Sequence, residues 1–168
     1  MVRAGMSFDD GNARVTFLRT AAETGGEVHE QRVEYAPGSR FPPRHFHPDQ
    51  DEFFAVERGR MLFEVDGADR EIGTGEEIGI PRGVRHRARN ASADEPAVVR
   101  WETRPALRTG EFQMLAYRLG SHAGLLDSAL LAYEYRDVFR LSGPARLVVP
   151  IAGWLARVTG RRLPPLDQ

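Results

Sequence analysis

Apolar and polar residues alternate along the first two thirds of the chain, in short segments that end at glycine, proline or aspartate. These segments are 15–17, 28–35, 53–56, 61–65, 77–80 and 98–101. A period of two is typical of half-buried strands, and many short strands at close spacing indicate a sandwich or barrel. We therefore predict a mainly β region over about residues 12–104, with Arg58-Gly59-Arg60 as the turn of a hairpin.

The pattern changes after Pro105. Apolar residues recur at helical spacing over 111–119 and 125–139, and Pro144 is typical of the first turn of a further helix, over 145–159. We expect Pro150 to kink or interrupt that helix, because proline has no N–H to donate. Residues 1–105 are thus predicted to form a barrel, and residues 106–168 a helical extension that packs on the barrel or on a partner subunit.

The composition is that of one soluble globular domain. The chain has 168 residues, of which 41% are hydrophobic and 28% charged, which is enough for one core and too little for two ordinary domains. The net charge of −1 and the absence of a helix-turn-helix pattern give no support to a nucleic-acid partner. Cysteine and lysine are both absent, which excludes disulfides, thiolate ligands and lysine Schiff bases.

The first ten residues contain no apolar segment of the kind found in signal peptides. No run in the chain approaches the roughly 20 apolar residues that a membrane-spanning helix needs. We therefore expect a cytoplasmic protein.

Three histidines and one glutamate are candidate metal ligands. His45, His47 and Glu52 lie close together in the sequence, and His86 comes from a separate segment. His45 and His47 would project from one face of a strand. Three imidazoles and one carboxylate suit a divalent transition metal: Fe, Mn, Ni, Cu, Co or Zn. Four protein ligands leave coordination positions open, which is typical of a catalytic or substrate-binding site rather than a structural one.

The spacing of these residues resembles the paired motifs of the cupin superfamily. The first element contains, in order, Gly38, His45, His47, Glu52 and Gly59, and the second contains Gly75, Pro81, Gly83, His86 and Asn90. The second matches the family pattern at every defining position, whereas the first has one extra residue before His45. The resemblance covers about residues 28–104. It implies a mainly β, cupin-type double-stranded β-helix (jelly-roll) barrel around a metal, here followed by a short α-helical C-terminal segment.

Strand parity identifies candidate pocket residues. Phe54 and Val56 lie two and four residues after Glu52, so on a strand they should point to the same side as Glu52, and Phe53 should face away. Phe46 lies between two candidate ligands, so it should point to the opposite side and pack in the core. Further candidates for the wall of the cup, meaning the cavity inside the barrel beside the candidate ligands, are Met61, Phe63, Tyr35 and Trp101. An apolar cup would suit an aromatic or polyketide-like molecule. Arginines near the motifs could attract an anionic substrate, although we favour ordinary surface positions for them: Arg40, Arg44, Arg82, Arg85 and Arg87.

The resemblance implies a metal-dependent enzyme that acts on a small organic molecule, either an oxygenase or an isomerase/cyclase. One alternative is a cupin that binds or senses a small molecule through its metal without turnover. Another is a metal-free cup in which His and Glu act as general acid and base. The intact ligand positions disfavour the metal-free cup.

The apolar segment within 145–162 raises a separate question about partners. Arginines flank it on both sides, a combination that could lie on a membrane surface. The segment could equally pack on the barrel, cap the cup or form a dimer contact. Because the run is short and a monomer rarely exposes such a patch, we favour packing or a homodimer over membrane contact.

Overall fold

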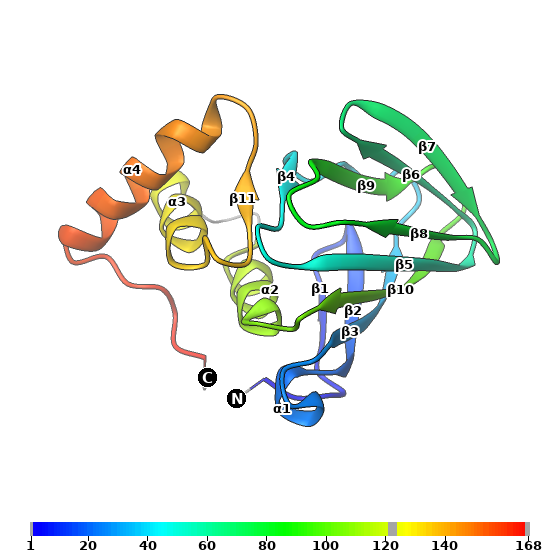
Figure 1. Cartoon of the computed structure of the whole chain (residues 1–168), viewed down its shortest axis with the longest axis horizontal. Helices are drawn as coiled ribbons and strands as arrows, with labels where there is room; N and C mark the ends of the chain where they lie inside the picture. The colour runs from blue at the N-terminus through cyan, green and yellow to red at the C-terminus, as the bar shows by residue number, and fades with distance from the viewer. Residues whose placement is uncertain (1, 121–123, 167–168) are drawn as a thin grey trace.

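In a computed structural model, the chain forms two antiparallel β-sheets that share a core and are followed by helices (Figure 1). The structure describes residues 2–120 and 124–166. The strands of the barrel are β1 (Ser7–Asp9), β2 (Ala13–Arg19), β3 (His29–Tyr35), β4 (His45–Phe46), β5 (Asp51–Arg58), β6 (Arg60–Val65), β7 (Ala68–Gly73), β8 (Glu77–Ile80), β9 (His86–Asn90) and β10 (Ala97–Arg104). The short helix α1 (Ala21–Thr24) connects β2 to β3. The predicted fold class, a mainly β jelly-roll barrel with a helical C-terminal segment, is confirmed.

The alternation of side chains decides what each sheet presents to the core. One sheet has the strand order β1-β2-β3-β10-β5-β8, and the other has the order β11-β4-β9-β6-β7, in which β11 is Arg140–Leu141 of the C-terminal segment. Along β5, Phe54 and Val56 are buried, whereas Phe53 is 47% exposed. Met61 and Phe63 of β6 meet them from the other sheet. Burial of such side chains, at about 25 cal/mol per Å² of apolar surface, is the main force that holds the two sheets together.

The predicted hairpin at Gly59 is wrong. β5 pairs with β10 and β8, whereas β6 pairs with β9 and β7, so the chain crosses from one sheet to the other at this glycine. Gly59 has a φ of +81°, and a Cβ there would lie 2.8 Å from the carbonyl oxygen of Pro96. Glycine fits this crossing without strain. The local pattern marks the turn correctly but carries no information about which strands then pair.

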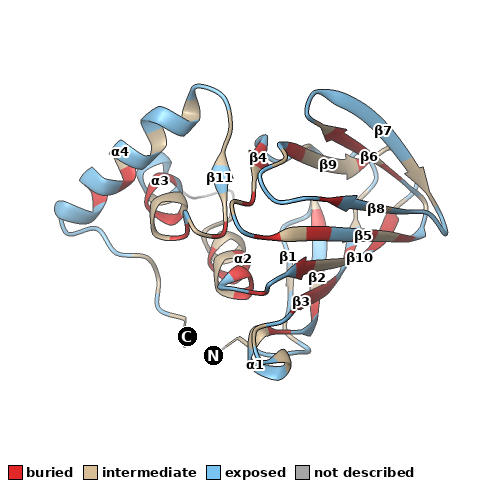
Figure 2. Cartoon of the chain, viewed as in Figure 1, coloured by how far each residue is buried: buried red, intermediate tan, exposed pale blue. Residues whose placement is uncertain are grey.

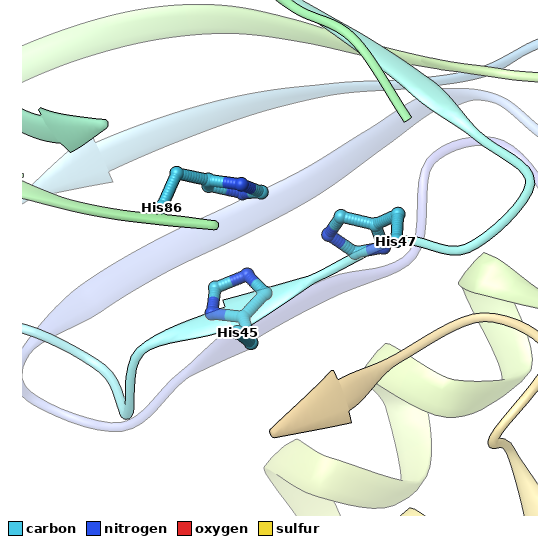
Figure 3. A group of neighbouring side chains, drawn as sticks. All are labelled: His45, His47 and His86. Atoms are coloured by element: carbon cyan, nitrogen blue, oxygen red, sulfur yellow. The ribbon is translucent and has the colours of Figure 1, made fainter. Parts of the chain in front are cut away.

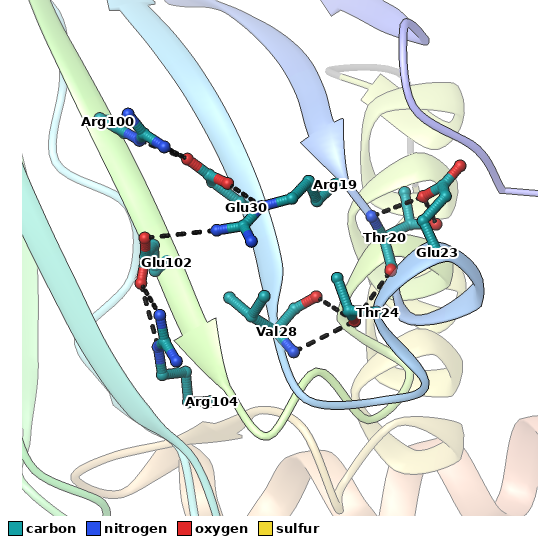
Figure 4. Close-up of polar contacts among 9 residues, drawn as sticks. All are labelled: Arg19, Thr20, Glu23, Thr24, Val28, Glu30, Arg100, Glu102 and Arg104. Carbon is teal, nitrogen blue, oxygen red and sulfur yellow. Dashed lines mark hydrogen bonds and ion pairs between the residues drawn. The ribbon is translucent and has the colours of Figure 1, made fainter.

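Charged residues form a network on the outer face of the larger sheet (Figure 4). Glu30 is 1% exposed and is held between Arg19 and Arg100. Glu102 of β10 pairs with Arg104 at 2.6 Å and with Arg19 at 3.7 Å. Two guanidinium groups compensate the buried carboxylate, which would otherwise be costly to desolvate. The network therefore joins β2, β3 and β10 on the side of the sheet that faces away from the core.

The C-terminal segment contains α2 (Thr109–Leu119), α3 (Leu125–Glu134), β11 (Arg140–Leu141) and α4 (Ala145–Val158). β11 pairs with β4, and Leu141 lies opposite His45 in the register. The segment is therefore not purely helical, because it adds a strand to the sheet that carries the histidines. The helical spacing predicted over 125–139 holds only as far as Glu134, since the chain then turns toward the barrel.

Helix α4 continues through Pro150, so the expected interruption does not occur. A proline costs about 3 kcal/mol in a helix interior. Small residues hold α4 closely on α3: Gly153 and Ala156 are buried, and the Gly153 backbone lies against Ala129 and Tyr133. We infer that this close packing compensates for the hydrogen bond that Pro150 cannot donate.

The larger apolar side chains of α4 are exposed to solvent (Figure 2). Six of them are between 47% and 65% exposed: Leu147, Val148, Ile151, Trp154, Leu155 and Val158. They recur at helical spacing and form one stripe, termed here the α4 outer face. Among the described residues, no helix is long and apolar enough to cross a membrane.

Candidate metal centre

Three histidine rings converge between β4 and β9 (Figure 3). His45 lies in β4, His47 follows that strand, and His86 begins β9, where it is the register partner of His45. One ring nitrogen from each histidine lies within 4.8 Å of the others. All three side chains are buried. This spacing allows the three rings to hold one metal ion.

Each histidine has its Nδ1 atom held by a backbone carbonyl. The distances are 2.8 Å from His45 to Pro43, 2.6 Å from His47 to Val138, and 3.0 Å from His86 to Val84. Because a carbonyl oxygen only accepts, each Nδ1 carries a proton, so Nε2 is the nitrogen that each imidazole can offer to a metal. Two of the carbonyls are local in sequence, whereas Val138 comes from the C-terminal segment, 91 residues away from His47.

Glu52 lies on the inward face of β5 beside the histidines and is 1% exposed. Its Oε2 atom is 2.8 Å from Nε2 of His86, and its Oε1 atom is 3.2 Å from Nε2 of His47. The indole N–H of Trp101 donates to Oε1 at 3.1 Å. The buried Nε2 of His47 has no hydrogen-bond partner within the described residues. The structure thus brings the four predicted ligands together and leaves a nitrogen that a metal would satisfy.

The protonation states of Glu52 and His45 suit a metal. Burial opposes the ionisation of Glu52, but the neighbouring His47, His86 and His45 outweigh it and lower the pKa of Glu52 to about 2. Burial, together with His86 and His47, lowers the pKa of His45 to about 3. Burial also disfavours charge on His86, but its hydrogen bond to Glu52 raises the pKa of His86 on balance. Metal ligands must be deprotonated, and Glu52 and His45 already are near neutral pH.

The histidines border a cavity of about 330 Å³. Three predicted wall residues, Tyr35, Phe54 and Trp101, line its barrel side. The remaining walls include residues of the C-terminal segment: Phe112, Gln113, Ala116 and Tyr117 of α2, and Val138 and Phe139 before β11. The ring of Phe139 stacks on His45, with centroids 4.6 Å apart. The C-terminal segment therefore covers the ligands at the mouth of the barrel.

Three other predicted wall residues do not border this cavity. Val56, Met61 and Phe63 are each at most 2% exposed and belong to the apolar core. They point into the barrel, as the alternation of side chains along the strands indicates. They lie away from the histidines, however, because β5 and β6 extend past the site. Phe46 faces away from the ligands as expected, yet it borders a second cavity instead of packing in the core.

The arginines near the motifs are mostly engaged elsewhere. Among the described residues, Arg40 is the one arginine that borders the cavity beside the histidines. The others form ion pairs with carboxylates: Arg44 and Arg87 with Glu64, Arg82 with Asp51, and Arg85 with Asp66. Those four guanidinium groups are therefore already paired, as expected of surface arginines.

The sequence did not reveal the part that Val138 and Phe139 play at this site. The helical spacing extends up to residue 139, which suggests one more turn of helix. A backbone carbonyl has no signature in a sequence, since every residue carries one. The helical spacing of α2 could show an apolar face, but it could not show that this face would meet the cup.

The central part of the chain, residues 31–101, matches the family model described as the cupin domain. Oxalate oxidase GF-3.8 of Triticum aestivum is 31% identical over 110 residues, which cover 59% of this chain and 49% of that protein. Polyketide synthase CurC of Streptomyces cyaneus is 35% identical over 63 residues, which cover 38% of this chain and 40% of that protein. The chain thus spans about half the length, or less, of these relatives.

A solved structure shows the same fold. It is an RmlC-like cupin from Shewanella frigidimarina NCIMB 400, which is similar to this chain with a TM-score of 0.53 and 18% sequence identity. The match covers 62% of this chain and 87% of the other. At this identity the similarity concerns the architecture alone.

Proposed function

Because residues 31–101 match the cupin domain, we propose that this chain is a metal-dependent cupin that acts on a small organic molecule. We assign His45, His47, His86 and Glu52 as the ligands of one divalent transition metal: Fe, Mn, Ni, Cu, Co or Zn. The observation that carries the proposal is the convergence of three histidines with anchored Nδ1 atoms beside an ionised carboxylate. Three nitrogen donors and one oxygen donor suit these metals.

We propose an enzyme, either an oxygenase or an isomerase/cyclase. A bound metal would supply redox or Lewis-acid chemistry at the coordination positions that the protein leaves open. The N–H of Trp101 holds Glu52 in place, and the aromatic walls exclude water from the substrate. Burial, and then the charge of Glu52, raise the pKa of Tyr35, so its phenol stays protonated and can donate a hydrogen bond to a substrate oxygen.

The cavity favours an aromatic or polyketide-like substrate over a small dianion. Its walls include the rings of Phe54, Trp101 and Phe112. Apart from the proposed metal, Arg40 is the one cation that borders it within the described ranges, so most of the wall would contact the apolar part of a substrate. The similarity to a protein named as a polyketide synthase points in the same direction.

Metal analysis tests the ligand assignment. Purified without chelators, the native protein should contain about one metal ion per chain by elemental analysis. His47→Ala and Glu52→Ala should each lose most of it, because each removes a ligand. His29→Gln is the matched control, a buried histidine outside the cluster, and it should keep the metal. Unchanged metal in both ligand variants would disprove the assignment.

The alternative is a cupin that binds or senses a small molecule without turnover. The observation that favours it is the stacking of Phe139 on His45, since a covered site suits retention of a ligand. The metal-loaded protein can be incubated with a hydroxylated aromatic ketone such as 1-hydroxy-2-acetonaphthone. Oxygen uptake with product formation supports an oxygenase, and a product of unchanged mass supports an isomerase or cyclase. Binding without any product supports the alternative.

We also propose that the α4 outer face forms a homodimer contact. Its six large side chains are each between 47% and 65% exposed, and burying them in a partner would be favourable. Arg157 and Arg161 are already paired with Glu134 at 2.7 Å and Asp127 at 2.6 Å. This pairing weakens the attraction of α4 for an anionic membrane.

Light scattering tests the dimer. Ile151→Glu should convert a native dimer to a monomer, whereas Leu18→Glu, which changes an exposed apolar residue on β2, should leave the dimer intact. A native monomer that binds anionic vesicles, and loses that binding in Ile151→Glu, would favour the membrane alternative instead.

A further inference from the structure

A second cavity, of about 400 Å³, lies between β4 and the helices α3 and α4. Its volume is within the range of small-molecule sites. We term it the outer cavity, because none of the four proposed metal ligands borders it. Much of its wall is apolar or aromatic, and includes Phe46, Tyr133, Phe139, Leu141, Val149 and Pro150.

Three arginines border the outer cavity: Arg136, Arg140 and Arg146. In the described part of the chain, none of the three forms an ion pair with a carboxylate, in contrast to Arg157 and Arg161 nearby. Arg136 donates to the carbonyl of Tyr133 and Arg140 to that of Arg136, each at 2.8 Å. All three side chains are exposed, and a carbonyl does not cancel a full charge, so these guanidinium groups place positive charge at the rim of this apolar cavity.

The start of α4 adds to this positive field. Arg146 and Val149 lie within the first two turns of the helix, so the cavity adjoins its amino-terminal end. The first turn of α4 contains no acidic residue. The dipole of a helix attracts anions at this end, in the same sense as the three arginines.

We propose that the outer cavity binds an amphipathic organic anion, namely an aromatic or other apolar ring that carries a carboxylate, sulfonate or phosphate. The ring would occupy the space between Phe46, Tyr133 and Val149, and the anionic group would meet the guanidinium groups at the rim. Charge-assisted hydrogen bonds to a guanidinium are stronger than neutral ones. This site stands independently of the proposed metal chemistry, because it shares no side chain with the ligand set.

Phe139 connects the two cavities, since it borders both of them. On the inner side its ring stacks on His45, and the adjacent Val138 carbonyl accepts from His47. An anion bound against the outer side of Phe139 therefore contacts the segment that orients two of the histidines.

Calorimetry with naphthalene-1-sulfonate on the metal-loaded full chain tests the proposal. The native protein should bind about one molecule per chain, and the uncharged naphthalene-1-methanol should bind much more weakly. Arg146→Gln should weaken sulfonate binding by about tenfold or more, the size expected for one hydrogen bond to a charged group. Arg70→Gln, which changes an exposed arginine on β7, is the matched control and should not change the affinity.

Three further variants locate the probe. Val149→Phe fills the apolar part of the outer cavity and should also abolish binding, whereas Ile151→Gln on the α4 outer face should not. Glu52→Gln should keep sulfonate binding even if it loses metal. Unchanged affinity in both Arg146→Gln and Val149→Phe would overturn the proposal. So would loss of binding in Ile151→Gln or Glu52→Gln, which would place the probe on the outer face or at the metal.

Discussion

The barrel and helix α4 use their apolar residues in opposite ways. In the barrel, large side chains such as Phe63 and Met61 are buried, with at most 1% of their surface exposed. In α4 the buried positions belong to Gly153 and Ala156, while Leu147 and Ile151 on the other face are 65% and 62% exposed. Both regions show clear apolar periodicity, but in α4 the larger side chains stay largely exposed in the described part of the chain.

This difference shows that periodicity locates an apolar face without showing what covers it. A strand in a two-sheet barrel has a second sheet opposite its inward face, so apolar residues of the right parity are buried. A helix on the surface can approach its neighbour through either large or small residues. In α4 the small residues allow a close approach to α3, and this leaves the large residues free for another partner.

The largest effect on the free energy of unfolding is expected from truncating a buried side chain of the barrel, compared with an exposed side chain of α4. Phe63→Ala should lower the free energy of unfolding by about 3–5 kcal/mol, because it leaves a cavity in the core. Leu147→Ala should change it by less than about 0.5 kcal/mol in the monomer. Urea unfolding monitored by circular dichroism measures both. A loss at Leu147 that approaches the loss at Phe63 would show that the α4 outer face is covered in solution.

A smaller effect on the free energy of unfolding is expected from adding a methyl group where α4 packs on α3. Glycine to alanine in an exposed helix stabilises it by about 1 kcal/mol. At Gly153, however, an added Cβ would lie 2.4 Å from the carbonyl oxygen of Ala129 and 2.4 Å from Cβ of Tyr133. Gly153→Ala should therefore destabilise the protein, by about 1–3 kcal/mol in the same unfolding measurement. A gain in stability would contradict the close packing of α4 on α3.

The smallest effect is expected in the pH dependence of stability, from the buried His29 between the barrel and α2. Burial, which outweighs the polar contacts of Gln31 and Gln113, lowers the pKa of His29 below the usual value for histidine. A histidine with a lowered pKa in the folded state stabilises the fold above its unfolded pKa, and this stability is lost as the pH falls below about 6.5.

His29→Gln should therefore flatten the stability curve between pH 7 and pH 5, by at most about 1.4 kcal/mol per pH unit relative to the native protein. Urea midpoints across this range measure it, and the difference between the two proteins removes the contributions of the other histidines. Parallel curves for the two proteins would show that His29 titrates normally and is not held neutral by burial.

Much of the barrel could be predicted from local pattern. The alternation around Val33, Phe54 and Phe63 located strands β3, β5 and β6, because strand side chains have a period of two. The strand β7 was missed, since its sequence is polar and its residues are mostly exposed. The pairing of β5 with β10 rather than β6 was also missed, because strand partners are chosen by contacts across the whole barrel.

The grouping of the four candidate ligands could be predicted because its evidence is local. Residue type, parity and the spacing of glycines and a proline identified His45, His47, Glu52 and His86 as one group. The far walls of the cavity could not be predicted in this way. They come from α2 and from the turn at Val138 and Phe139, whose positions depend on how the C-terminal segment packs.

The sequence by itself determined the chemistry of this protein: a barrel, three imidazoles and a carboxylate on its inward positions, and an apolar helix at the end. Only the tertiary structure decided that Val138 orients His47, that Phe139 separates two cavities, and that α4 turns its larger side chains outward. The physical reason is the range of the interactions. The alternation of side chains along a strand and the type of each ligand are properties of a few neighbouring residues. The contact between His47 and Val138, which are 91 residues apart, depends instead on how the whole chain packs.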